Sequence, residues 1–165
     1  MNNIILIGMP GAGKSTVGVV LAKMTGYHFL DSDLLIQETE GRLLREIIAE
    51  EGRDRFVEIE DRINAGIRCE RTVIATGGSA VYGEQAMAHF KAIGTVVYLQ
   101  IPCEELAERL GCLEGRGVAL RDGQTLMDLY EERTVLYEKY ADVVVQSAGL
   151  GIEKTAREII SRVKI

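Results

Sequence analysis

The feature that most constrains this chain is a glycine-rich loop, Gly8-Met9-Pro10-Gly11-Ala12-Gly13-Lys14-Ser15. An apolar run that ends at Gly8 precedes it, in the pattern of a strand buried on both faces of a parallel sheet. Lys14–Thr25 follows, with apolar side chains at helical spacing and Gly26 as a stop. The loop has the spacing G-x-x-x-x-G-K-[ST] in the strand–loop–helix context that this phosphate-binding motif requires. The sequence therefore predicts an α/β domain with a phosphate site at the start of its first helix.

The residue types in this loop suit a bound phosphate. Glycines let consecutive backbone N–H groups converge on an anion at a helix N-terminus, whose dipole favours negative charge. We expect Lys14 to reach the β and γ phosphates and the Ser15 hydroxyl to ligate Mg²⁺, while Thr16 lies near the α-phosphate or simply starts the helix. A glycine turn that binds no nucleotide is the alternative. The expected phosphate-binding residues are Gly11, Ala12, Gly13, Lys14, Ser15 and Thr16.

Strand and helix patterns alternate along the rest of the chain. This alternation favours parallel strands with right-handed crossovers and helices on both faces of the sheet. We expect a three-layer α/β/α fold of the P-loop NTPase type, with a five-stranded parallel sheet, as a single domain over residues 1–165. Helices over residues 33–69 form an insertion, and the glycine-rich residues 111–123 form a mobile lid loop. The further strands are predicted at residues 28–31, 72–76, 95–100 and 143–145, and the further helices at 34–40, 43–50, 53–69, 84–92, 104–110, 125–140 and 152–164.

Composition excludes several classes of protein. A net charge of −6 and a pI near 5.1 argue against sequence-independent nucleic-acid binding, which needs clustered Lys and Arg. No apolar stretch approaches the roughly 20 residues of a membrane helix, and the first residues lack the basic region of a secretory signal. Three widely spaced cysteines suggest reduced thiols. We expect a cytoplasmic monomer that binds neither nucleic acid nor membrane.

Two carboxylates follow the second predicted strand, in Asp31-Ser32-Asp33. In a phosphoryl-transfer site, one carboxylate can hold magnesium through water while the other accepts or orients the proton of the attacking hydroxyl. The alternative is a helix N-cap supplied by Asp33 or Ser32, and the two roles can coexist.

The combination of motifs resembles the shikimate kinase family. The resemblance extends from Asn3 to about Val145, and its Walker loop is shared with many NTPases. It implies a small kinase that moves the γ-phosphate of MgATP to a hydroxyl of a small polar acid. Besides the loop and the Asp-Ser-Asp motif, it is carried by Gly52 with Phe56 and Glu60, by Ala75-Thr76-Gly77-Gly78, by Arg109 and Arg116, and by Arg133-Thr134-Val135-Leu136-Tyr137.

The resemblance also implies roles for single residues. Lys14, Asp33 and Arg116 are the expected catalytic residues, with Arg116 as a lid arginine on the transferred phosphate. Ser15 and, through water, Asp31 are expected to hold Mg²⁺. From the residues alone, the alternative for Arg116 is a solvated loop charge, and the alternative for Arg133 is an exposed, salt-bridged helix face. The remaining implied roles are Arg109 over adenine and Asp33, Gly77, Gly78 and Arg133 on the acceptor.

The sequence departs from the family in the acceptor half. Shikimate kinases usually follow the phenylalanine that matches Phe56 with an arginine that grips the acceptor's carboxylate, whereas this chain has Val57. Valine cannot replace the charge-assisted hydrogen bonds of a guanidinium, and Glu60 loses the partner it would orient. The Arg53 side chain, one helical turn earlier, could reach into the acceptor pocket or be exposed to solvent. The other departures are Ser79 for a third glycine, Gly117-Val118 in the lid and Val135 for a proline.

Several functions therefore stay open. The first is a kinase acting on shikimate or on another hydroxylated metabolite, such as a hydroxy acid or hydroxy amino acid. The second is a nucleotide or gluconate kinase, which the Asp-Ser-Asp motif and the motif that starts at Arg133 disfavour. The third is a non-catalytic regulatory domain that binds nucleotide, and the retention of Asp33 and Arg116 argues against it.

Overall fold

A five-stranded parallel sheet forms the centre of the computed structural model, which describes residues 2–110 and 123–165. The strand order is β2-β3-β1-β4-β5, and all four pairings are parallel. The prediction of a five-stranded parallel α/β fold is thus confirmed. The strands are β1 (Asn3–Ile7), β2 (His28–Asp31), β3 (Thr72–Ala75), β4 (Gly94–Gln100) and β5 (Val143–Gln146).

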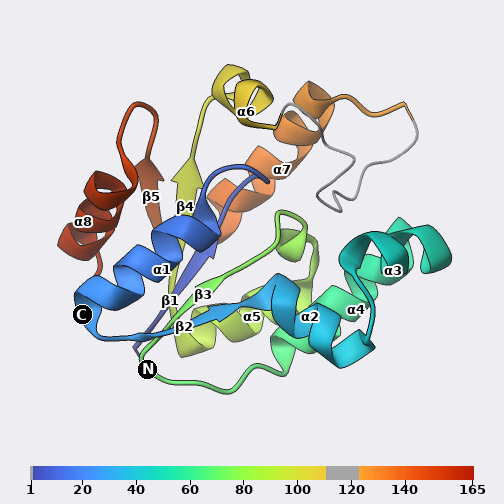
Figure 1. The fold of residues 1–165 in the computed structure, drawn as a ribbon, viewed down its shortest axis with the longest axis horizontal. Helices are drawn as coiled ribbons and strands as arrows, with labels where there is room; N and C mark the ends of the chain where they lie inside the picture. The colour runs from blue at the N-terminus through green and yellow to red at the C-terminus, as the bar shows by residue number, and fades with distance from the viewer. Residues whose placement is uncertain (1, 111–122) are drawn as a thin grey trace.

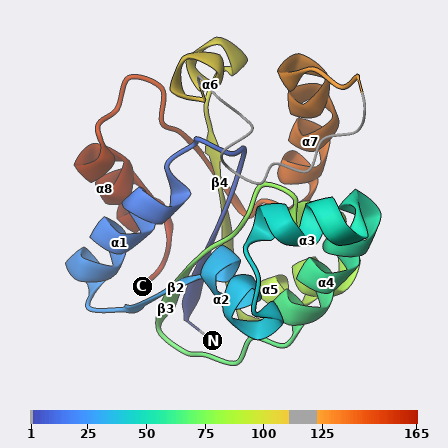
Figure 2. The ribbon, with the colours of Figure 1, turned by 45° about the vertical axis from the view of Figure 1, so that its right-hand side comes forward.

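Helices cover both faces of this sheet, as Figures 1 and 2 show. α1 (Lys14–Thr25) and α8 (Ile152–Arg162) pack side by side on one face. α5 (Glu84–Ile93) and α7 (Leu126–Tyr140) cover the other, and α6 (Cys103–Arg109) follows β4. Every residue of β1 is buried, because the strand lies at the centre of the sheet between two helical layers. None of the described helices is both long and apolar enough to cross a membrane.

Three helices are inserted between β2 and β3, as the sequence predicts. They are α2 (Ser32–Glu40), α3 (Leu44–Glu51) and α4 (Arg53–Ala65), and α4 packs against α5. The insertion has a small apolar core of its own, separate from the core around the sheet. This second core consists of Ile36, Leu44, Ile47, Phe56 and Ile59.

Some boundaries differ from the predictions. α2 begins at Ser32 because Asp31 is its N-cap: the Asp31 side chain accepts hydrogen bonds from the backbone N–H groups of Asp33 and Leu34. The alternative of a cap supplied by Asp33 or Ser32 is therefore wrong in its residue, because Asp31 supplies the cap. α4 ends at Ala65, before Gly66, and a short 3-10 turn, η1 (Ala80–Tyr82), was not predicted. Almost all of the predicted lid, including Arg116, lies outside the described residues.

Candidate active site

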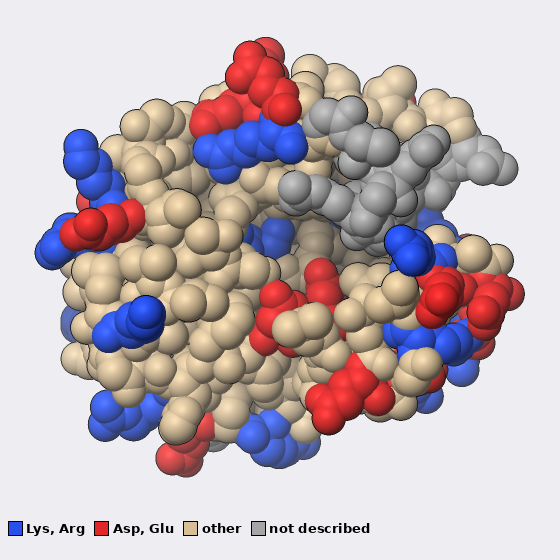
Figure 3. Space-filling view, viewed as in Figure 1, with Lys and Arg blue, Asp and Glu red and all other residues tan. Residues whose placement is uncertain are grey.

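A pocket of about 550 Å³ opens where the strands end at their carboxyl termini. Its walls come from the glycine loop and α1, from the segment after β3, from α2, α3 and α4, and from Arg109 and Arg133. Figure 3 shows a hollow near the middle of one face, with Lys or Arg atoms inside it and Asp or Glu atoms along its lower edge. Residues from distant parts of the sequence thus share one polar cavity.

The glycine loop takes a conformation that only glycine adopts without strain. Gly11 and Gly13 have φ values of 82° and 87°, and Gly13 is the N-cap of α1. The first N–H groups of a helix have no partner within the helix, and they carry its positive dipole end. The start of α1 therefore offers several N–H donors to an anion in the pocket, as predicted from the motif.

Lys14 is the first residue of α1, and its side chain is buried with 7% exposure. Its Nζ donates to the carbonyl oxygens of Gly8 at 2.7 Å and Met9 at 2.8 Å. Burial lowers the pKa of Lys14 to about 8, and the negative charge of Asp33 opposes this shift. A bound phosphate would favour the charged ammonium form in the same way, since it adds negative charge beside the Nζ atom.

Ser15 and Asp31 form a donor set that suits magnesium. The Ser15 hydroxyl donates to Asp31 Oδ2 at 2.7 Å, while Asp31 Oδ1 caps α2. Magnesium prefers oxygen ligands, and in nucleotide sites it takes one or two from the protein and the rest from phosphates and water. The described residues contain no cluster of three or more His, Cys, Asp or Glu side chains that would hold a metal by themselves. The pair therefore fits a metal that arrives with the nucleotide.

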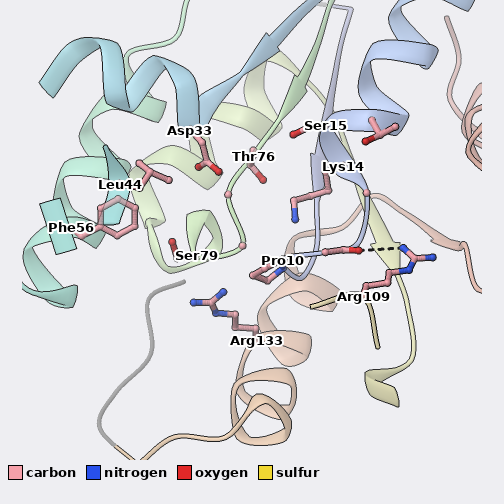
Figure 4. Close-up of a pocket in the computed structure, with 15 residues that line it drawn as sticks. Pro10, Lys14, Ser15, Asp33, Leu44, Phe56, Thr76, Ser79, Arg109 and Arg133 are labelled. Carbon is pink, nitrogen blue, oxygen red and sulfur yellow. Dashed lines mark hydrogen bonds between the residues drawn. The ribbon is translucent and has the colours of Figure 1, made fainter. Parts of the chain in front are cut away.

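Asp33 lies across the pocket from Lys14, as Figure 4 shows. Burial and, to a smaller extent, the nearby Asp31 carboxylate raise the pKa of Asp33 to about 6, and Lys14 opposes the shift. A Cβ atom on Gly77 would lie 2.6 Å from Asp33 Oδ1, so the backbone passes close to this carboxylate only because residue 77 is glycine. Such a carboxylate is suited to accept a proton near neutral pH.

Arg133 is buried with 1% exposure, although it is part of the amphipathic helix α7. The alternative of an exposed, salt-bridged face is thus wrong for this residue, and its guanidinium points into the pocket (Figure 4). A Cβ atom on Gly78 would lie 2.8 Å from Arg133 Nη1, which shows how closely the guanidinium approaches the backbone. Arg133 and Gly78 thus line the same pocket, and their role in binding an acceptor stays a prediction.

Tyr137, the last residue of the motif that starts at Arg133, also fixes the backbone of the site. Its buried hydroxyl donates to the carbonyl oxygen of Gly78 at 2.6 Å. Thr76 belongs to the motif Ala75-Thr76-Gly77-Gly78, but the sequence assigns it no role of its own. Its hydroxyl donates to the carbonyl oxygen of Leu6 at 2.9 Å, which ties the segment after β3 to β1. The spacing of Tyr137, four residues after Arg133, was the available signal for a shared face of α7.

Glu60 has a hydrogen-bond partner that the sequence does not predict. The Ser79 hydroxyl donates to Glu60 Oε1 at 2.6 Å, and Glu60 is only 1% exposed. Burial raises the pKa of Glu60 to about 7, and the hydrogen bond from Ser79 opposes the shift. Ser79 stands where the resembling family has a third glycine. Its hydroxyl thus donates to the Glu60 carboxylate, which has Val57 beside it in place of the family's arginine.

Arg109, the last residue of α6, lies at the rim of the pocket. It donates to the carbonyl oxygen of Gly11 at 3.2 Å and pairs with Glu105 at 2.7 Å. This contact places Arg109 against the glycine loop, on the same side of the pocket as Lys14 and Pro10 (Figure 4).

The buried carboxyl of Glu60 predicts how stability depends on pH. Its folded pKa of about 7 exceeds its ordinary value of 4.5, so the folded chain binds more protons between these pH values and its stability falls as pH rises through them. The raised pKa of Asp33 likewise makes the stability fall as the pH rises. We expect Glu60→Gln to reduce this fall, measured as the free energy of unfolding in urea at about pH 5 and about pH 7.5.

The matched control is Glu58→Gln, because Glu58 lies on the same helix with an exposed side chain. This control should keep the pH dependence of the wild-type chain. An unchanged pH dependence in Glu60→Gln would show that the Glu60 carboxyl is ionised alike in the folded and unfolded chains.

Comparisons with known proteins agree on one family. A protein-family model described as shikimate kinase matches residues 10–164. A shikimate kinase of Persephonella marina is 32% identical over 165 residues, which cover 99% of this chain and 100% of that protein. Shikimate kinase 2 of Dickeya chrysanthemi is 37% identical over 153 residues, 87% of this chain and 86% of that protein. The structure of a shikimate kinase from Acinetobacter baumannii in complex with shikimate aligns with a TM-score of 0.88 at 31% identity, covering 98% of this chain and 92% of that one.

Proposed function

This chain belongs to the shikimate kinase family, whose members are phosphotransferases acting on a hydroxyl group, and from this premise we propose that it phosphorylates shikimate with MgATP. The products are shikimate 3-phosphate and ADP. The observation that carries the proposal is the single pocket in which Lys14, Asp33 and Arg133 face one another. These side chains supply a cation for phosphate, a base for a hydroxyl and a cation for a carboxylate.

The phosphates of ATP lie on the glycine loop in this proposal. The N–H groups at the start of α1 and the Lys14 ammonium bind the β and γ phosphates, while Ser15 and Asp31 face the metal. Magnesium bound there neutralises charge on the phosphates. Arg109 covers the adenine from the end of α6. The role expected for Arg116, on the transferred phosphate, falls on a residue outside the described ones.

The acceptor lies between the segment after β3 and Arg133. Arg133 binds the acceptor's carboxylate, and Gly77 and Gly78 let the backbone approach its ring. Asp33 orients the attacking hydroxyl and takes its proton as the oxygen bonds to the γ-phosphorus and the bond to the ADP oxygen breaks. The structure of the relative that contains shikimate supports this acceptor, because its fold aligns along nearly the whole chain.

The test is ADP release from MgATP at saturating shikimate, with a panel of hydroxy acids and hydroxy amino acids run in parallel. We expect turnover with shikimate and little ADP release without an acceptor. Because Val57 brings no charge to the acceptor wall, a different hydroxylated acceptor is the second candidate. Turnover with another member of the panel and none with shikimate would favour that candidate, whereas no acceptor-dependent ADP release would contradict the kinase.

A further inference from the structure

Arg53 is a nearly buried cation, and no buried carboxylate among residues 2–110 and 123–165 forms an ion pair with it. It begins α4, and its side chain is 12% exposed. Its ion pair, at 3.3 Å, is with Asp54, whose side chain is 94% exposed and therefore well solvated. The Nε atom of Arg53 is buried and has no hydrogen-bond partner among the described residues. A buried donor of a charged group usually has an acceptor, and none of the described residues supplies one to this atom.

Tyr82 connects Arg53 to the pocket. The Arg53 guanidinium lies over the Tyr82 ring, 4.8 Å from its centroid, and the Arg133 guanidinium lies 5.4 Å from the same centroid. Arg133 Nε also donates to the Tyr82 hydroxyl at 3.4 Å. Two positive charges are thus held within about 10 Å of each other around one ring. An anion bound beside that ring would reduce the repulsion between them.

The orientation of α4 supports the same placement. Phe56 lies three residues after Arg53, and Glu60 lies four residues after Phe56. These spacings put the three side chains on one face of the helix. Phe56 lines the pocket, and Glu60 accepts a hydrogen bond from Ser79, which also lines it. This face of α4 is therefore turned towards the acceptor half of the pocket, with Arg53 at one end of it.

We propose that Arg53 is an acceptor-binding residue that, together with Arg133, holds the carboxylate of the acceptor beside Tyr82. This inference rests on the proposed function, since it assigns a further contact to the same acceptor. A carboxylate can accept hydrogen bonds from two guanidinium groups at once, because each oxygen has two lone pairs. Part of the specificity for an acidic acceptor then comes from Arg53, at the start of α4, although position 57 has no charge.

The experiment compares shikimate with its uncharged methyl ester, using the wild-type chain and Arg53→Met. We expect Arg53→Met to raise the KM for shikimate roughly ten- to a hundredfold, the usual range for one hydrogen bond to a charged group, and to leave the KM for ATP little changed. The preference for the acid over the ester, as a ratio of kcat/KM values, should fall in the variant. Arg55→Met is the matched control, because Arg55 lies on the same helix with a half-exposed side chain.

The two proposals fail in different ways. No turnover of shikimate by the wild-type chain would overturn the proposed function and this inference with it. Turnover by the wild-type chain with an unchanged acid-to-ester ratio in Arg53→Met would overturn the inference alone, because a purely structural role lowers activity on both acceptors equally. If Arg53→Met does not fold, Arg53→Gln keeps a polar side chain at the same position, and the same ratio decides.

Discussion

Replacing Lys14 with methionine is expected to lower kcat by roughly a thousandfold, the largest effect that we predict for a single substitution. Lys14 Nζ donates to two carbonyl oxygens of the glycine loop, where the β and γ phosphates are expected to bind. Removing one preorganised donor from a site of developing charge costs about 10² to 10³ in kcat, and the lost donor here also carries a full charge. The measurement is ADP release at saturating MgATP and acceptor.

The fold should tolerate this substitution. Methionine has nearly the length of lysine, and it removes a buried charge whose pKa burial lowers to about 8. The matched control is Lys23→Met, since Lys23 is exposed in the last turn of the same helix. We expect wild-type turnover in the control and an unchanged melting temperature in both variants. Unchanged turnover in Lys14→Met would contradict the assignment of the phosphate site.

Replacing Asp33 with asparagine is expected to lower kcat by about 10² to 10⁴, the range for loss of a general base. Asparagine keeps the size of the side chain beside Gly77 but cannot take the proton of the acceptor hydroxyl. Binding of ATP should change little, because the N–H donors of the glycine loop, Lys14 and Ser15 are all retained. Turnover and nucleotide affinity, measured separately, test the two parts of this prediction.

The pH profile gives a second measure of the same carboxyl group. Since the pKa of Asp33 is raised to about 6, protonation should remove its basic form and lower the wild-type kcat/KM for the acceptor below about pH 6. Glu38→Gln, an exposed change on the same helix, should keep both the rate and this profile. An equal loss of ATP binding in Asp33→Asn would contradict the acceptor-side role of Asp33.

The fold was predictable because its signals are local. The bounds of α1 and β2 match the prediction, since the glycine loop, the apolar run of β1 and Gly26 lie next to the residues that they affect. The nucleotide half of the site follows from the same continuous stretch of sequence. Asp33 and Gly77, by contrast, lie 44 positions apart in the numbering, and only the motifs of a resembling family pointed to a common site.

The acceptor half was harder to predict because its contacts join distant segments through unusual residues. The hydrogen bond between Ser79 and Glu60 exists only because both residues face the gap between α4 and the segment after β3. The contact of Arg53 with Tyr82 depends on η1, a short turn that has no periodic signal in the sequence. Even the cap of α2 was placed one or two residues late, because three polar residues in a row could each supply it.

The separate core of the inserted helices bears on how such a protein can change during evolution. Ile36, Leu44, Ile47, Phe56 and Ile59 stabilise the acceptor wall by packing mainly against one another. Substitutions in groups that share no partners have nearly additive effects on stability. The inserted helices can therefore accumulate substitutions while the glycine loop and the central sheet keep their stability. In this way the same phosphate-transfer site can be combined with different acceptor preferences.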